Sequence, residues 1–515
     1  MCSSDLISLT SPASGTGNGS FAFTVAPDSV GRTAAITLGS ASFTVQQLSS
    51  AAPGLFIGSM PHIAAQSVWT TTFTVVNTTS GASLARLSLL GSDLIPNGNG
   101  NPLALSLDLP QAPATTLVGA AVERTLAPNA SLIVKTSERP DLPVATGSVL
   151  VNANSSMSGF AIFRRVPDSQ EAVVPLETRD ASSYVLYFDN TNGLSLGVAV
   201  ANISAQAGTV GVIVRDDTGA QIATGSIPLP GNGQTSFLLT DSKWFPGTAN
   251  KRGTIEFDTP TGGRISVLGI RNSPPLTSIT TVPPLAAVGT NGGNFAYLAS
   301  GGGWKTSIVL TNTGTKAGAA HLKFFDTAGA ALSLPVSFPQ IGGNATPLTT
   351  VDQTLAPGAT LLIESGALTG ALLTGSAQFT TDGNISGFVI FRNLVNNQEA
   401  VVPIESRNAN AYLLAFDNTA GTFTGVAMSS TSIKSQPVSV GIVIRDDTGA
   451  QIASDTIQLP ANGLRAFTLA FDKYPETSGL LGTIEFTPPA GEQISVLGIR
   501  QPLAGTLTTL PALVR

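Results

Sequence analysis

The sequence predicts an all-β protein, a tandem array of Ig-like antiparallel β-sandwiches. One observation behind this prediction is strand periodicity: in Thr209–Val214, the residues Val210, Val212 and Val214 share one face. A second is that Gly, Pro, Asn and Asp separate such segments about every 8–12 residues, which is typical of sandwiches and barrels. A third is a long internal repeat, and no long segment shows the 3.6-residue period of a helix.

The internal repeat sets the domain organisation. "QEAVVPLETR" at Gln170–Arg179 returns as "QEAVVPIESR" at Gln398–Arg407, and other matching segments also lie 228 to 235 residues apart. One unit therefore runs from residue 56 to 285 and the second from 292 to 515. Repeated text is expected to encode architecture, because a catalytic site is normally built once.

A weaker duplication divides each unit into two halves. Landmarks in the same order align Asn77, Asn202 and Asn312, with Ser430 in the fourth place. We therefore predict four related sandwiches of about 90–120 residues, folding as successive independent units after a short N-terminal β module. The predicted domains are the N-terminal module 1–49, sandwich 1a 56–178, sandwich 1b 179–285, sandwich 2a 292–406 and sandwich 2b 407–515.

The nine-residue segment "RDDTGAQIA", at 215–223 and again at 445–453, is predicted to form a β-hairpin. An Asp at the first position of a type I turn accepts backbone N–H bonds, and a Gly at the fourth enters the left-handed region without strain. The predicted turn residues are Asp216 with Gly219, Asp326 with Gly329, and Asp446 with Gly449.

Composition argues against several classes of function. Charged residues make up 11% of the chain, against roughly 25% in an ordinary domain, and this favours an extracellular β-protein. A net charge of −6 without a basic run argues against nucleic-acid binding. No apolar segment approaches the ~20 residues of a membrane span. We expect a monomer without a cofactor.

The N-terminal segment "MCSSDL" is interpreted as adapter-derived sequence, which makes residues 1–6 artefactual. On this interpretation the natural N-terminus and its signal peptide were lost by truncation, and the protein is extracellular or displayed on a cell surface. Cys2 is the only cysteine, so an internal disulfide framework and a multi-cysteine metal site are excluded.

Two resemblances extend this interpretation. Leu9–Gln47, with its "SGTGNG" turn and its "RTAAITL" and "FTVQQ" strands, resembles the C-terminal half of a BACON domain. That resemblance implies a small Ig-like sandwich of a family found beside secreted bacterial carbohydrate enzymes and proposed to bind carbohydrate. Residues 56–515, with "GFAIFR", "QEAVVP" and "VLGIR", resemble tandem repeats of uncharacterised secreted proteins from environmental bacteria. This second resemblance implies secretion and no particular chemistry.

Paired carboxylates are the first catalytic candidates, because a glycosidase needs two. Glu171 and Glu177 lie six residues apart, as do Glu399 and Glu405. Pro175 interrupts the strand that would bring the first pair to one face. Structural ion pairs are therefore favoured over catalysis for these acids.

Metal and hydrolase sites find less support. The turn aspartates, together with Asp189 and Asp417, are loop oxygen donors, but no D-x-D-x-D loop supplies the 6–8 oxygens of a calcium site. His62 and His321 lack a second His or Cys at zinc-ligand spacing and lack a G-x-S-x-G elbow. We favour structural roles for these residues and predict no metal.

Tryptophan is the usual platform for stacking a sugar ring. Trp69 and Trp304 are repeat-equivalent and begin apolar strands, which favours core packing. Trp244 is unmatched in the second unit and lies in the loop "DSKWFPGTANKR". It is the one candidate for a ligand contact.

Four strand-ending arginines align between the sandwiches, and we predict that they form ion pairs or hydrogen bonds at sandwich junctions. The planar guanidinium suits a carboxylate, and Glu177 and Glu405 are the neighbouring acids considered. The four arginines are Arg164, Arg271, Arg392 and Arg500.

Three functions remain open. The favoured hypothesis is a non-catalytic structural or adhesive scaffold or spacer. The partners considered across the hypotheses are another surface protein and an extracellular polysaccharide. The alternative is a carbohydrate-binding accessory of an extracellular polysaccharide-degrading system. An enzyme whose site spans two sandwiches would need an unrepeated polar cluster, and the sequence offers none.

Overall fold

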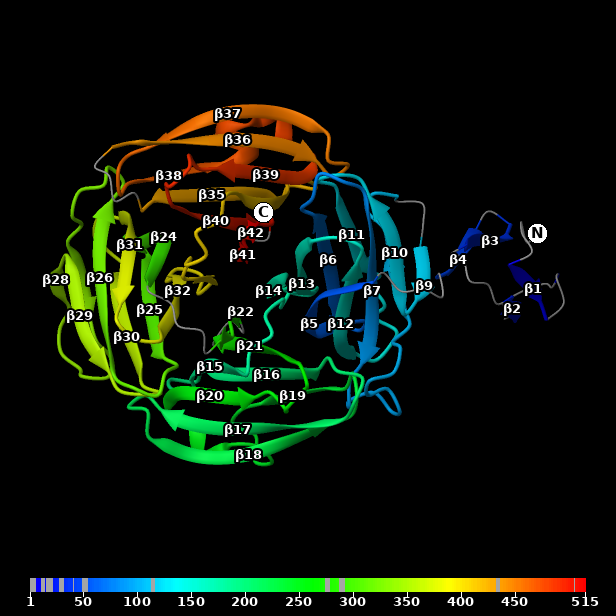
Figure 1. Ribbon diagram of the computed structural model, residues 1–515, viewed down its shortest axis with the longest axis horizontal. Helices are drawn as coiled ribbons and strands as arrows, with labels where there is room; N and C mark the ends of the chain where they lie inside the picture. Colours follow the sequence, from blue (N-terminus) through cyan, green and yellow to red (C-terminus); the bar gives the residue numbers. More distant parts are fainter. Residues whose placement is uncertain are drawn as a thin grey trace.

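A computed structural model describes residues 6–10, 14, 22–26, 32–39, 41–48, 54–112, 116–273, 278–286, 292–431, 436–503 and 505–515. The predicted all-β sandwich array is confirmed, since nearly all regular structure lies in antiparallel sheets. The four sandwiches lie in a ring in the order 1a, 1b, 2a, 2b, with 2b beside 1a (Figure 1). The N-terminal strands lie outside the ring, next to sandwich 1a.

All four sandwiches repeat one strand order. The first sheet places the fourth, third, sixth and first strands side by side, and the second sheet contains the fifth, second, seventh and eighth. In sandwich 1a the first sheet is β10 (Ala121–Leu126), β7 (Ser83–Gly91), β12 (Ala145–Ala153) and β5 (Leu55–Ala65). Its second sheet is β14 (Gln170–Pro175), β13 (Met157–Arg165), β6 (Trp69–Asn77) and β11 (Ser131–Thr136), extended by β8 (Leu105–Asp108) and β9 (Thr116–Gly119).

Sandwich 2a has the same arrangement, with β27 and β28 inserted where 1a has β8 and β9. Its first sheet is β29 (Thr350–Leu355), β26 (Gly318–Asp326), β31 (Leu373–Thr381) and β24 (Gly292–Ser300). The second layer comprises β33 (Glu399–Pro403), β32 (Ile385–Asn393) and β25 (Trp304–Asn312), and β30 (Thr360–Ala367), β27 (Leu334–Ser337) and β28 (Thr346–Leu348).

Sandwiches 1b and 2b add a short ninth strand that pairs with the first. In 1b the first sheet is β18 (Gln221–Leu229), β17 (Gly208–Asp216), β20 (Arg252–Asp258), β15 (Ser183–Asp189) and β23 (Leu285–Ala286). Its second sheet is β19 (Gln234–Leu238), β16 (Ser195–Asn202), β21 (Ile265–Ser273) and β22 (Ser278–Val282). In 2b the first sheet is β37 (Gln451–Leu459), β36 (Val438–Asp446), β39 (Leu481–Thr487), β34 (Tyr412–Asp417) and β42 (Leu513–Val514). Its second sheet is β38 (Leu464–Thr468), β35 (Phe423–Ser430), β40 (Ile494–Gln501) and β41 (Thr508–Leu510). Single helical turns are η1 (Pro246–Thr248), η2 (Leu469–Lys473) and η3 (Pro475–Thr477).

Neighbouring sandwiches are joined by one recurrent hydrogen bond, in which a backbone N–H is the donor. The connection between the third and fourth strands of one sandwich meets the first residue of the fifth strand of the next. The four contacts run from Gln234 N to Asn99 Oδ1 at 2.8 Å, Thr360 N to Asp217 O at 3.0 Å, Leu464 N to Thr327 O at 3.2 Å and Ser131 N to Asp447 O at 3.0 Å. The last of these joins 2b to 1a. The same head-to-tail interface used four times therefore closes the ring.

The expectation of independent units is wrong, because each hydrophobic core continues into a neighbour. The core of 1b includes Val309 and Phe388 of 2a, and the core of 2b includes Val76 and Phe160 of 1a. At the first of these interfaces Tyr187 meets Phe388 edge-to-face, with ring centroids 6.0 Å apart. Burial of apolar surface between sandwiches stabilises the ring together with the backbone contacts.

The eighth strands meet around the centre of the ring. Strand β14 contacts β22 and β41, and β33 contacts the same two strands. Thr281 Oγ1 on β22 donates a hydrogen bond to the carbonyl oxygen of Val173 on β14. These strands place their neighbouring arginines and acids at the interfaces between sandwiches.

The aligned asparagines act as side-chain ties inside their sandwiches. The amide of Asn77 donates to the carbonyl oxygens of Gly81 at 2.8 Å and Leu126 at 3.2 Å. Asn312 makes the equivalent bonds to Lys316 at 2.8 Å and Leu355 at 3.0 Å. A buried amide at the end of the second strand thus satisfies carbonyls of the following loop and of the fourth strand, which explains its recurrence.

The N-terminal segment is partly joined to sandwich 1a. Strand β4 (Ala41–Gln47) pairs in parallel with β9 at Thr44 and Leu117, and β3 (Arg32–Leu38) extends the same eight-stranded sheet. The two-stranded sheet of β1 (Ile7–Leu9) and β2 (Phe23–Val25) lies beside it. Cys2 and residues 15–19 of the "SGTGNG" turn lie outside the described residues.

Closure of the ring can be tested with an engineered disulfide. In a Cys2→Ser background, Ser131→Cys with Asp447→Cys is expected to form an internal disulfide on mild oxidation, because their backbone atoms hydrogen-bond at 3.0 Å. The measurement is a mobility shift on a non-reducing gel that reductant reverses. The single-cysteine variants are controls, and an unshifted double variant would contradict contact between 2b and 1a.

The turns at the sandwich junctions predict that a Gly→Ala change lowers stability more at a junction than at a turn without a neighbouring sandwich. Gly219 has φ +90°, and a Cβ there would overlap the carbonyl oxygen of Pro357 in the next sandwich. Gly262 has φ +71°, and a Cβ added there would have no described neighbour within 4 Å. Gly262→Ala should cost about 1 kcal/mol of backbone strain and Gly219→Ala roughly 2 kcal/mol more. Equal denaturant midpoints for the two variants would show that the turn at Gly219 is not docked.

Candidate functional site

The strongest polar site lies between sandwiches 2b and 1a. The Arg500 cluster comprises Arg500, Glu171 and Asp417. Arg500 Nη1 donates to both carboxylate oxygens of Glu171 at 2.6 Å, and Nη2 donates to Asp417 Oδ2 at 3.1 Å. Thr508 Oγ1 gives Glu171 a further bond at 3.2 Å. The Glu171 side chain is only 2% exposed, so its charge is compensated by groups from the other sandwich.

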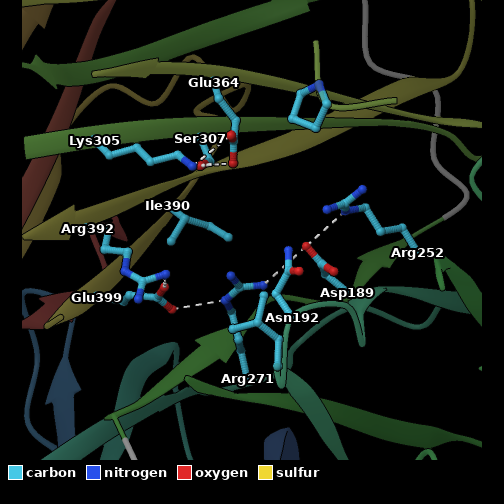
Figure 2. A pocket seen from close by; sticks show the side chains of 12 residues that line it. Asp189, Asn192, Arg252, Arg271, Lys305, Ser307, Glu364, Ile390, Arg392 and Glu399 are labelled. Atoms are coloured by element: carbon cyan, nitrogen blue, oxygen red, sulfur yellow. Dashed lines mark hydrogen bonds and ion pairs between the residues drawn. The ribbon is translucent and has the colours of Figure 1, made fainter. Parts of the chain in front are cut away.

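The equivalent site between 1b and 2a has fewer hydrogen bonds between its central arginine and the acids. The Arg271 cluster comprises Asp189, Arg252, Arg271 and Glu399 (Figure 2). Arg271 Nε donates to Glu399 Oε2 at 3.0 Å, but Arg271 Nη1 lies 4.0 Å from Asp189 Oδ2. Arg252 Nε donates to Asp189 instead, at 3.0 Å. In the other cluster Leu481 occupies the place of Arg252, and there Asp417 is bound by Arg500 itself.

The strand register explains where these acids lie. Glu171 pairs across β14 and β13 with Arg164, and Glu399 pairs across β33 and β32 with Arg392. Arg164 Nη2 nevertheless bonds Ser169 Oγ at 2.7 Å, and Arg392 Nη2 bonds Asn397 Oδ1 at 2.8 Å. The two acids are therefore bound across the sandwich interfaces by the other pair of arginines.

Both interface arginines remain cationic. Burial by itself lowers the pKa of Arg271, but the negative charges of Glu399 and Asp189 more than offset it, and the pKa lies above its ordinary value. Arg500 behaves in the same way beside Glu171 and Asp417. Each cluster therefore places arginine cations against carboxylates of the neighbouring sandwich.

The two acids that the sequence suggested as partners of the strand-ending arginines bind other arginines. Glu177 binds Arg179, with Nη2 to Oε2 at 2.6 Å, and Glu405 binds Arg407, with Nε to Oε1 at 3.0 Å. The chain leaves the strand after Pro175 and Pro403, and each acid then bonds to an arginine two residues further along. Each such arginine also lies over a tyrosine ring, Tyr184 or Tyr412.

No converging acid pair of the glycosidase kind is formed by these residues, since Glu171 and Glu177 bind different arginines. Searched over the described residues, the chain has no group of three or more His, Cys, Asp and Glu side chains that could hold a metal ion. Asp189 and Asp417 take part in the clusters above.

The turn aspartates serve the hairpins. Asp216 Oδ1 accepts bonds from the backbone of Thr218 at 3.0 Å and Ala220 at 3.1 Å. Asp446 and Asp326 repeat the pattern. Gly219, Gly329 and Gly449 have φ values of 90°, 90° and 89°. The same turns form the sandwich junctions, so one motif closes the hairpin and contacts the next domain.

The aromatic candidate is half-buried. Trp244 stacks on Phe237 with ring centroids 3.9 Å apart and an interplanar angle of 13°. One of its two faces is therefore occupied within sandwich 1b. Trp69 packs edge-to-face on Phe163 at 5.9 Å, and Trp304 packs against the core of sandwich 2a.

The histidines have separate environments. His62 lies at the 1a–1b interface, where Gln234 Nε2 is 3.3 Å from His62 Nδ1. Burial lowers the pKa of His62 from 6.5 to about 4, so the ring is neutral at pH 7. His321 is exposed and lies 2.6 Å from Asp352 Oδ1.

Each ion cluster borders a cavity. Cavity 1, beside the Arg271 cluster, has a volume of about 400 Å³, and cavity 2, beside the Arg500 cluster, about 260 Å³. Lys305, Glu364 and Arg252 line cavity 1, and no sequence pattern had predicted a role for them. The sequence does mark these three positions, because their charge differs between the two repeat units. The matching residues are Thr70, Lys135 and Leu481.

Comparison of the chain with protein-family models and with curated protein sequences found no match. Among the described residues, no helix has the length and apolar character needed to cross a bilayer.

The buried ion pairs predict unequal costs of arginine removal. Arg271→Ala leaves Glu399, 2% exposed, without its hydrogen-bonded cation, and should cost about 3–5 kcal/mol. Arg139→Ala removes an exposed pair with Asp141 and should change stability far less, because solvent screens the attraction between exposed charges. Thermal melting of both variants measures the difference. Similar melting temperatures would contradict a structural role for Arg271.

Proposed function

We propose that the chain is a non-catalytic structural and adhesive scaffold, secreted or displayed on a cell surface. The observation that supports this proposal is that the repeated polar residues form their hydrogen bonds and ion pairs with other groups of the same molecule. The turn aspartates bond to their own hairpins, and the interface arginines bond to buried acids. A catalytic centre would instead need converging polar groups free to meet a substrate.

The closed ring favours a platform over an extended spacer. Sandwiches 1a and 2b are far apart in sequence but hydrogen-bond at Ser131 and Asp447. A chain whose first and last large domains touch cannot hold a distant module far from its base. The low charge and the hydroxyl-rich composition support an extracellular setting for such a platform.

The second candidate is a carbohydrate-binding accessory, favoured by the half-exposed Trp244. Its stacking on Phe237 holds the indole in one orientation, and a pyranose ring would stack on the opposite face. The resemblance of Leu9–Gln47 to a BACON domain supports the same candidate. Polysaccharide from the surroundings would be the partner.

One set of assays tests both candidates. On the scaffold proposal we expect no turnover of a glycoside and ester panel and no retention of the protein on insoluble polysaccharides. Retention that falls at least about tenfold in Trp244→Ala, but not in Trp69→Phe, would favour the carbohydrate-binding candidate. Turnover that survives repurification would overturn the non-catalytic proposal.

A further inference from the structure

Cavity 1 is a polar chamber between sandwiches 1b and 2a. Its lining includes four cationic side chains and three anionic ones, so the formal charge of the wall is positive. Asp189 is bound by Arg252 at 3.0 Å, Glu399 by Arg271 at 3.0 Å and Glu364 by Lys305 at 2.7 Å. The fourth cation, Arg392, belongs to none of these three pairs.

Arg392 and Glu399 are incompletely paired. Within the described structure, Arg392 has no carboxylate at hydrogen-bonding distance; Glu399 Oε1 is 3.8 Å from its Nη1. That oxygen has no hydrogen-bond partner among the described residues, although the Glu399 side chain is only 1% exposed. A buried carboxylate oxygen without a donor is costly, and it predicts that another donor reaches it.

The matched position in cavity 2 lacks this feature. Both oxygens of Glu171 accept bonds from Arg500, and Thr508 adds a third donor. Cavity 2 is also smaller, about 260 Å³ against about 400 Å³. The same ion pair is therefore complete in one copy and incomplete in the other, at the larger cavity.

We propose that cavity 1 binds a small carboxylate whose neighbouring carbon carries a hydrogen-bond donor, such as a 2-hydroxy or 2-amino acid. The ligand carboxylate would bind Arg392, and the adjacent hydroxyl or ammonium would donate to Glu399 Oε1. The 3.8 Å separation of those two protein groups suits an acceptor and a donor on adjacent carbons.

The rest of the wall fits the same class of ligand. Ile390 lies between the charged groups in Figure 2, and Leu194 and Pro339 complete an apolar surface for a short carbon chain. Ser307 and Asn192 supply further polar contacts for additional hydroxyl groups. A volume of about 400 Å³ lies within the range of small-molecule sites. This inference does not depend on the scaffold proposal.

Calorimetric titration of the full chain tests the inference with three matched three-carbon acids. Lactate and alanine carry a donor on the second carbon and propionate carries none. Gluconate tests a longer hydroxy acid, and glucose lacks the carboxylate. We expect one site per chain for lactate, alanine or gluconate, and no binding of propionate or glucose at the same concentration. Binding of lactate alone or alanine alone separates the hydroxy-acid and amino-acid sources.

Arg392→Gln should weaken that binding at least about tenfold. Arg164→Gln, the matched change at cavity 2, should leave it unaltered, and circular dichroism melting checks that both variants fold. The inference is overturned if lactate, alanine and gluconate all fail to bind at concentrations up to about 10 mM, because weaker binding would carry little specificity. Equal binding of propionate, or unchanged binding in Arg392→Gln, would also overturn it. If Arg392→Gln fails to fold, the ligand panel on the unaltered protein decides.

Discussion

Hydrogen bonds from the fifth strand of one sandwich to the connection after the third strand of the preceding sandwich are the interaction on which the rest of the structure depends. The contact is head-to-tail, so its geometry decides whether successive units form an open filament or a closed ring. Here four such contacts close, and Ser131 of the first sandwich meets Asp447 of the last. The glycine at the hairpin tip matters because only a residue without a Cβ allows the next backbone so close.

Contact between neighbouring sandwiches brings buried charges together, and at the 2b–1a interface the two sandwiches are distant in sequence. Glu171 and Glu399 would be unfavourable in an isolated sandwich, because a carboxylate without a cation is costly to bury. Arg500 and Arg271 supply those cations from the neighbouring sandwich. The ion pairs thus favour the closed arrangement through the penalty of leaving an acid unpaired, more than through the attraction itself.

Duplication followed by divergence distinguishes the two interfaces. At the 2b–1a interface the position of Arg252 is held by the uncharged Leu481. Asp417 therefore binds Arg500, and both acids of the cluster are hydrogen-bonded to that arginine. At the other, Arg252 binds Asp189, and a further ion pair lines the wall of a larger cavity. A scaffold with repeated junctions can in this way acquire a ligand site at one junction while the other remains structural.

Strands and turns could be predicted from the sequence because they depend on a few neighbouring residues, as the bonds of Asp216 within its own turn show. The sequence by itself thus determined the β class, the hairpins, the repeated sandwiches and the conspicuous arginines. Glu177 and Glu405 were wrong as partners of those arginines, since each binds an arginine two residues away. Only the tertiary structure decided that the array closes, that Arg271 binds Glu399 128 residues away, and that a cavity lies beside them. The physical reason is that packing of whole surfaces sets the angle between rigid domains, and no short pattern in the chain records that angle.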